Sequence, residues 1–151
     1  MNTAIIFESN HHGSTKKICD AIGQRYDVTL IDAKDCPEEL EKYDLIGFAS
    51  GIAFGKFYKT ITEVMRNKLP KSKNVFFIYT CGRDSKNYAA EAKEIASGKA
   101  CKILGTYGCR GYDTFGPLKI IGGINKENPT DEEINAAIKF FDDVLKRCQY
   151  E

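Results

Sequence analysis

The sequence predicts an α/β fold in which helices cover both faces of a doubly wound, five-stranded parallel sheet with the strand order 2-1-3-4-5. Short apolar runs rich in β-branched and aromatic residues alternate with stretches whose apolar residues recur at helical spacing. The run at 43–50 is almost continuously apolar, which is typical of a strand covered on both faces. A chain of 151 residues suits one domain, so we expect a single domain over residues 1–151.

The expected strands and helices alternate from the start of the chain. An apolar run ending at Phe7 predicts the first strand, and the spacing of Ile18 and Ile22 predicts the helix after it. Further strands are expected at 28–32, 43–50, 74–80 and 101–108, further helices at 58–68, 88–98 and from Asp131 onwards, and connecting segments at 35–42 and 51–57. Thr130 and Glu133 form the pattern of a capping box at the start of the last helix.

The polar loop after the first strand is the strongest candidate for a binding site. Ligands of doubly wound sheets bind beyond the carboxyl ends of the strands, where the strand order reverses. Gly13 precedes a helix whose first backbone N–H groups favour an anion such as phosphate. Side-chain donors at this point are Ser9, Asn10, Ser14 and Thr15. The Walker and dinucleotide-binding patterns are absent. An ordinary helix cap, with Ser14 or Asn10 bonding to the helix and nothing bound, is the alternative.

Two further loops are expected beside the first. The segment 50–58 holds two glycines and three aromatic residues, and a flat aromatic ligand needs such a stacking face. The alternative is that Phe57 and Tyr58 pack in the core. The segment 81–88 adds Gly82 and Tyr88. A phosphate at the first loop and a planar ring between the other two describe a mononucleotide.

These features together resemble the flavodoxin family over essentially the whole chain. Residues 10–15 stand where that family has its phosphate loop, Thr/Ser-x-Thr-Gly-Asn-Thr. They match it at Gly13 and Thr15 and depart from it at Asn10, His12 and Ser14. The pair Phe54-Gly55 resembles the aromatic-glycine pair beside the flavin ring. The segment 81–88 is similar to the family's Gly-Asp-Ser-x-Tyr loop, with extra residues inserted. The segments 115–117 and 121–125 are similar to those of flavodoxin-like proteins of anaerobes.

The resemblance implies a flavodoxin-like three-layer sandwich that binds FMN without a covalent link and shuttles electrons between redox partners, a reductase and an acceptor. By position, the cofactor-binding residues would be Ser9, Asn10, His11, His12, Gly13, Ser14, Thr15, Ser50, Gly51, Ile52, Ala53, Phe54, Gly55, Thr80, Cys81, Gly82, Asp84 and Tyr88. We expect no catalytic side chain and no metal. One alternative is an FMN-dependent oxidoreductase acting on a small substrate of the quinone or protoporphyrinogen type. Another is an interaction module that no longer binds flavin.

The charge of the chain departs from the strongly acidic character of typical flavodoxins. Its formal net charge is +1, so no global field recruits nucleic acid or a membrane. Cationic residues are expected near the cofactor rim at Lys16, Lys56, Lys59, Arg83, Lys86, Arg110 and Lys119. They predict a locally positive rim that suits an anionic partner or substrate, and the alternative is a solvated rim with no partner.

The remaining features are less specific. No signal peptide or membrane span is apparent, so we expect a cytoplasmic protein. Six scattered cysteines lack zinc-site spacing and are expected to be mostly buried, reduced thiols, although Cys81 could be redox-active near the ring. His11 and His12 could tune phosphate binding or be incidental. The long segment 109–129 could cover the ring, offer a docking surface or simply pack on the surface.

Overall fold

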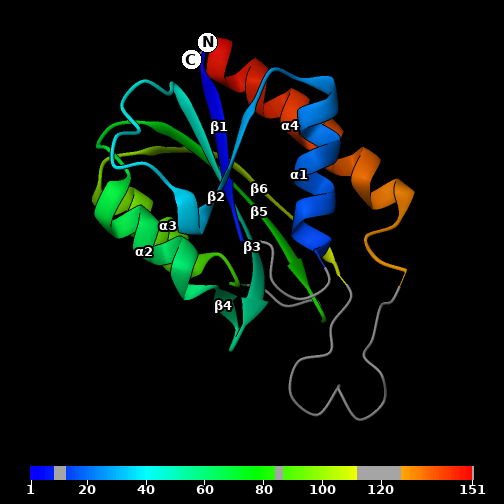
Figure 1. Cartoon of the computed structure of the whole chain (residues 1–151). Helices are drawn as coiled ribbons and strands as arrows, with labels where there is room; N and C mark the ends of the chain where they lie inside the picture. Colours follow the sequence, from blue (N-terminus) through cyan, green and yellow to red (C-terminus); the bar gives the residue numbers. More distant parts are fainter. Residues whose placement is uncertain (9–12, 84–86, 112–126, 151) are drawn as a thin grey trace.

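Five parallel strands form the centre of the molecule in the order β2-β1-β3-β5-β6, so the predicted strand order is confirmed (Figure 1). The structure is a computed structural model that describes residues 1–8, 13–83, 87–111 and 127–150. The strands are β1 (Thr3–Phe7), β2 (Thr29–Asp32), β3 (Leu45–Ala53), β4 (Lys56–Phe57), β5 (Asn74–Cys81) and β6 (Lys102–Arg110). The helices are α1 (Ser14–Arg25), the 3-10 turn η1 (Ala33–Asp35), α2 (Lys59–Lys68), α3 (Ala90–Gly98) and α4 (Asp131–Tyr150).

Two pairs of helices cover the two faces of the sheet. Helices α1 and α4 pack against one face over Ile5 and Phe76, and α2 and α3 pack against the other over Ile6 and Phe77 (Figure 1). Neighbouring residues of a strand point to opposite faces, so a strand between two helix layers buries all of its side chains. This is why the central strands read as unbroken apolar runs.

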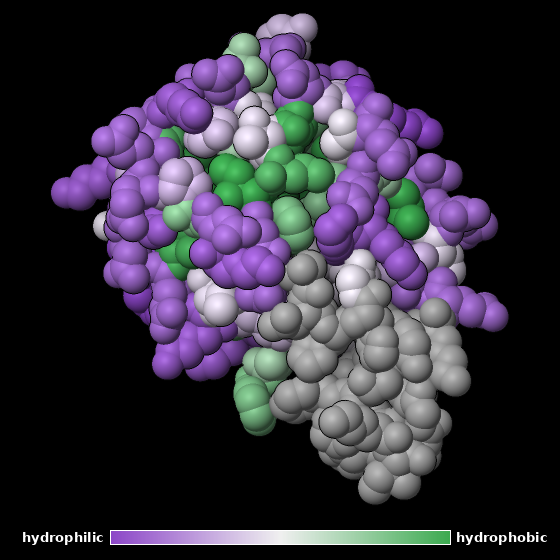
Figure 2. Space-filling model, in the orientation of Figure 1, coloured by the Kyte–Doolittle hydropathy of each residue, from purple (hydrophilic) through white to green (hydrophobic). Residues whose placement is uncertain are grey.

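The edge strand β2 is less well covered than the centre of the sheet. It carries the half-buried Leu30, and the half-buried Val28 precedes it. Seen from this side, the surface is mostly hydrophilic, and an apolar area lies in the middle of the view, where β2 runs (Figures 1 and 2). The connector that follows contains only η1 before β3, and it buries Leu40 and Tyr43 where a covering helix could have packed.

The expectation of a simple loop at 51–57 is wrong, because this segment forms a β-hairpin. Strand β3 continues to Ala53 and pairs with the antiparallel β4, Ala53 opposite Lys56. Phe54 and Gly55 make the two-residue turn, with φ of +54° and +77°. Tight hairpins favour turns with positive φ at both central residues, and glycine adopts this conformation easily. Phe57 is only 2% exposed, which confirms for this residue the alternative that it packs in the core.

The capping box at the start of α4 is confirmed. Thr130 Oγ1 accepts a hydrogen bond from the backbone N–H of Glu133, and Glu133 Oε1 accepts one from that of Thr130. Glu133 Oε2 also accepts a bond from the backbone N–H of Arg110, and its other oxygen accepts one from the Asn128 amide. One carboxylate therefore joins the end of β6 to the start of α4. Within the described ranges, no helix is long and apolar enough to cross a membrane.

Candidate functional site

The candidate site lies at the carboxyl edge of the sheet, where β1, β3 and β5 end next to one another. Phe7 pairs with Ala49, and Gly51 with Thr80, so the three strand ends are in register (Figure 1). Helix α1 begins at the same edge. Five of the predicted cofactor-binding residues lie outside the described residues: Ser9, Asn10, His11, His12 and Asp84.

Helix α1 begins at Gly13 rather than at a capping side chain. Gly13 is the N-cap residue in the left-handed conformation, φ +66° and ψ +24°, and no side-chain hydrogen bond caps it. No acidic residue stands in the first turn, and the hydroxyl residues Ser14 and Thr15 are buried there. The N-cap residue Gly13 has no side chain that could cap the helix, and the positive end of a helix favours an anion.

The start of α1 is tightly joined to the ends of β5 and β6. The hydroxyl oxygens of Thr15 and Thr80 lie 2.9 Å apart and are buried. Gly111 donates its backbone N–H to the Cys81 carbonyl at 2.9 Å. A Cβ atom on Gly111 would lie 2.9 Å from Ser14 Cβ and 3.0 Å from Thr80 Cβ. Only glycine fits between these two residues without a shift of the backbone.

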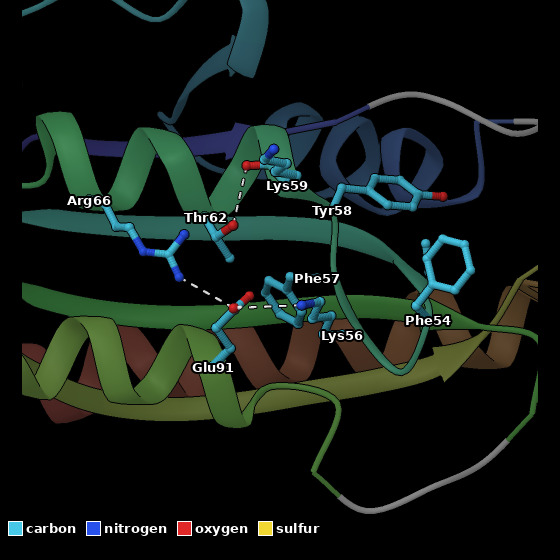
Figure 3. A pocket seen from close by; sticks show the side chains of 9 residues that line it. Phe54, Lys56, Phe57, Tyr58, Lys59, Thr62, Arg66 and Glu91 are labelled. Atoms are coloured by element: carbon cyan, nitrogen blue, oxygen red, sulfur yellow. Dashed lines mark hydrogen bonds and ion pairs between the residues drawn. The ribbon is translucent and has the colours of Figure 1, made fainter.

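The hairpin of β3 and β4 forms the second wall of the site. Ser50 Oγ donates to the Gly51 carbonyl at 2.6 Å and accepts from the Tyr58 backbone N–H at 2.9 Å. Its hydroxyl thus ties the end of β3 to the start of α2. Phe54 stands at the hairpin tip with 85% of its surface exposed, and its ring points away from Arg66 and Glu91 (Figure 3). An exposed aromatic ring at this edge presents a face on which a planar ligand could stack.

The third segment expected at the site, 81–88, contributes Cys81 and Tyr88. The buried Cys81 thiol donates to the Cys109 carbonyl at 3.4 Å. Tyr88 packs edge-on against Tyr79, with ring centroids 5.7 Å apart, and its hydroxyl donates to the Arg83 carbonyl at 2.7 Å. Tyr88 is therefore already fixed against β5.

The cysteines are free thiols. Four of them are buried, namely Cys19, Cys36, Cys81 and Cys109, while Cys101 and Cys148 are half-buried. Burial raises the pKa of Cys19 to about 12 and is the main cause that raises the pKa of Cys109 to about 12. These two thiols are protonated at neutral pH, which makes them poor nucleophiles. No group of metal-binding side chains occurs among the residues that the structure describes.

Three of the cations predicted at the rim pair with carboxylates. Lys16 Nζ lies 2.8 Å from Asp20, and Lys59 Nζ lies 3.8 Å from Glu63. The hydrogen bond to Asp20 raises the pKa of Lys16. Lys56 is paired as well, with Glu91 at 3.9 Å. These carboxylates weaken the positive field expected at the rim. Lys86 and Lys119 lie outside the described residues.

Two residues at this edge were missed by sequence reasoning. Glu8 follows β1 directly and is buried, and it accepts a hydrogen bond from the Thr60 hydroxyl at the start of α2. Its position after an apolar run was the signal that could have singled it out. Gly111 had no such signal, because its role depends on contacts with Ser14 and Thr80 from distant parts of the chain.

Comparison with known proteins gives one family match, one relative in sequence and two similar structures. Residues 4–106 match the sequence family described as flavodoxin domain. An uncharacterized protein of Methanocaldococcus jannaschii is 36% identical over 97% of this chain and 99% of its own length. A flavodoxin structure from the domain Archaea superposes with a TM-score of 0.71 at 17% identity, covering 97% of this chain and 99% of that one. A flavodoxin mutant of Fusobacterium nucleatum, bound to flavin mononucleotide, superposes with a TM-score of 0.69 at 14% identity and 97% coverage of both chains.

Proposed function

Since the chain belongs to the family of flavodoxin domains, we propose that it binds FMN without a covalent link and carries electrons between redox partner proteins. The observation that supports this most directly is the start of α1. It begins at Gly13, which has no side chain to cap it, and it lies at the carboxyl edge of the sheet, where the neighbouring strands β1 and β3 end. This is the switch point of the strand order, where doubly wound folds bind their ligands.

The residues at this edge fit the groups of FMN. A Cβ atom added to Gly13 would meet nothing within 4 Å, so Gly13 itself does not crowd the helix end. The backbone N–H groups of the first turn, with the hydroxyls of Ser14 and Thr15, would hold the phosphate. The hairpin tip at Phe54 and Gly55 and the segment from Thr80 to Gly82 would flank the ring. When bound, the flavin supplies the one- and two-electron chemistry.

The protein contributes positioning and exclusion of water. The contact between Thr15 and Thr80 fixes the phosphate end relative to β5. Ser50 fixes the root of the hairpin through its two hydrogen bonds. A ring held between two fixed strand ends exchanges electrons without large rearrangement of the protein.

An FMN-dependent oxidoreductase that acts on a small substrate of the quinone or protoporphyrinogen type is the second candidate. The observation that favours it is a pocket beside the hairpin of β3 and β4, lined in part by Ala53 and Phe54. A carrier needs only an accessible ring edge, whereas an enzyme needs a place for its own substrate. That the protein is located in the cytoplasm also stays a prediction.

The test begins with the visible absorption spectrum of the purified protein, followed by titration of the apoprotein with FMN and with riboflavin. We expect a flavin spectrum and a preference for FMN over riboflavin of at least about tenfold, because only FMN offers an anion to α1. Equal affinity for the two flavins would contradict the phosphate site. A colourless protein that ignores added FMN would contradict the whole assignment.

Kinetics then separate the carrier from the enzyme. A carrier, reduced by a flavodoxin reductase, passes electrons rapidly to an acceptor protein in stopped-flow mixing. An oxidoreductase instead turns over a quinone such as menadione many times with a saturable rate. The first outcome supports the proposed carrier role, and the second favours the alternative.

A further inference from the structure

A pocket of about 400 Å³ lies on the α2 and α3 side of the hairpin. Its residues come from the hairpin, from α2 and from the start of α3 (Figure 3). Apart from Ala53 and Phe54, it includes none of the residues expected to bind FMN. Its volume lies within the range of pockets that hold small organic molecules.

The charged residues of the pocket converge on one point. Arg66 Nη2 on α2 lies 3.3 Å from Glu91 Oε2 on α3, and Lys56 Nζ on β4 lies 3.9 Å from the same oxygen. Figure 3 shows Arg66 and Lys56 approaching Glu91 from opposite sides. Two cations that reach one carboxylate oxygen can also reach an oxygen of a bound anion.

Positive charge is in excess among the lining residues. The cations are Lys56, Lys59 and Arg66, and the lining contains one carboxylate, Glu91. Lys59 pairs with Glu63, but at 3.8 Å and with 87% of its side chain exposed, so this pair is weak. A ligand with a negative group would therefore find cations that one carboxylate does not neutralise.

The rest of the lining is apolar and aromatic. Ala53 is one of the lining residues. Phe57 lines the side nearest the sheet, and Phe54 and Tyr58 stand at the end near the hairpin tip (Figure 3). The ring of Phe57 is itself fixed by the ring of Phe77, 5.9 Å away and nearly perpendicular to it. A flat apolar body would bury surface against the exposed Phe54 and the half-buried Tyr58 and Ala53 while its charged group reached Arg66 and Lys56.

We propose that this pocket binds a small organic anion that combines a flat apolar body with a carboxylate group. The proposal goes beyond FMN binding, because the site stands on residues of β4, α2 and α3 outside the expected flavin crevice. Of the substrates considered for the oxidoreductase alternative, the protoporphyrinogen type carries carboxylates and belongs to this chemical class, whereas a quinone does not.

The experiment uses 2-naphthoate as the probe, titrated by calorimetry into the FMN-loaded protein and into the apoprotein. The expected result is saturable binding that persists when FMN is bound. The neutral analogue 2-naphthalenemethanol should bind at least about fivefold more weakly, since it cannot pair with Arg66. Binding that FMN abolishes would overturn the proposal, because the probe would then occupy the flavin crevice. An absence of saturation up to about 10 mM, beyond the range of specific ligands, would overturn it too.

Substitutions of Arg66, Glu91 and Lys59 test the electrostatics of the pocket. Arg66→Gln should weaken 2-naphthoate binding about fivefold or more, because it removes a charge-assisted hydrogen bond. Glu91→Gln should instead tighten binding about two- to fivefold, because it removes the carboxylate that competes with the ligand. A weaker complex with Glu91→Gln would overturn the proposal, since it would indicate a cationic ligand or a structural role of Glu91.

Lys59→Gln has a matched control in Lys139→Gln. Both lysines are highly exposed, at 87% and 78% of the side chain, and both pair with a carboxylate four residues later on the same helix. Lys59→Gln should weaken binding about twofold, and Lys139→Gln, on α4, should leave it unchanged. Equal effects of the two substitutions would mean that only net charge matters and would overturn the assignment of the site.

The outcomes for the pocket and for FMN are distinguishable. Flavin binding is read from the absorption spectrum, and probe binding from calorimetry. A yellow protein that ignores 2-naphthoate contradicts the pocket alone. An apoprotein that ignores FMN but binds 2-naphthoate, with the expected loss in Arg66→Gln, contradicts the flavin proposal alone.

Discussion

Thr15 and Thr80 share a hydrogen bond of 2.9 Å between their hydroxyl oxygens, although 65 residues separate them in the sequence. Thr15 lies in the first turn of α1, and Thr80 lies near the end of β5. The bond thus connects the expected phosphate end of the site with the strand expected to flank the ring. Both side chains are buried, so neither hydroxyl can easily exchange this partner for water.

Thr80→Val should lower the free energy of unfolding by about 1–3 kcal/mol, because it leaves the Thr15 hydroxyl buried without this partner. Urea unfolding of the apoprotein measures the change. The double variant Thr15→Val with Thr80→Val should lose less than the sum of the two single variants, since neither hydroxyl is then left alone. Strict additivity would show that the two hydroxyls do not depend on each other.

Gly111→Ala should weaken FMN binding, because its methyl group would press on Ser14 Cβ at 2.9 Å and on Thr80 Cβ at 3.0 Å. The start of α1 must then move away from the end of β5. We expect a loss of about tenfold, or about 1.4 kcal/mol, in a fluorescence titration with FMN. Gly98→Ala is the control, because a Cβ atom there meets nothing within 4 Å. Equal affinities of the two variants would contradict this role of Gly111.

Phe54→Asn should change stability and FMN affinity in opposite directions. Phe54 has φ of +54° and is 85% exposed, so its backbone conformation is unfavourable for phenylalanine and little packing is lost on its removal. Asparagine followed by glycine suits a tight hairpin turn, so the free energy of unfolding should rise by up to about 1 kcal/mol. If the ring stacks on the flavin, affinity for FMN should fall about three- to tenfold. Unchanged affinity would remove Phe54 from the flavin contacts.

Glu133→Gln should destabilise the protein at neutral pH but much less in acid. Burial tends to raise the pKa of Glu133, but hydrogen bonds from Thr130, Asn128 and the Arg110 backbone outweigh it and hold the pKa below its usual value of 4.5. A carboxylate with a lowered folded-state pKa stabilises the fold above pH 4.5, and this contribution is lost as the pH falls through the lowered value.

Urea unfolding at pH 7 and at about pH 3 tests this prediction for Glu133. The difference between wild type and Glu133→Gln should be largest at pH 7 and should shrink in acid. Its exposed neighbour Glu132 supplies the control, since Glu132→Gln changes the net charge equally. A difference that does not vary with pH would mean that Glu133 acts by shape and not by charge.

The sheet order and the helices could be predicted from the sequence, because a parallel sheet between two helix layers leaves unbroken apolar runs and helical spacings. The hairpin could not. Strand β4 has two residues, and its turn places Phe54 at a positive φ that no propensity favours. Only the pairing of Ile52 with Phe57 and of Ala53 with Lys56 makes this segment a strand.

The electrostatics of the site could be predicted only where the partners are close in sequence. The pairs Lys16–Asp20 and Lys59–Glu63 follow helical spacing and could have been predicted from the sequence. They would have reduced the positive charge expected at the rim. The pair of Arg66 with Glu91 joins two helices across 25 residues, so it depends on how α2 and α3 pack. The pocket that these side chains line had no signal in the sequence for the same reason.

The two ends of the described chain lie together at the amino edge of the sheet, opposite to the site (Figure 1). Met1 Sδ is 3.4 Å from Cys148 Sγ on the last helix. A fluorophore, an electrode linker or a fused domain attached at either terminus would therefore leave the crevice accessible. The protein could in this way be immobilised with the carboxyl edge of its sheet, where we propose that FMN binds, facing solution.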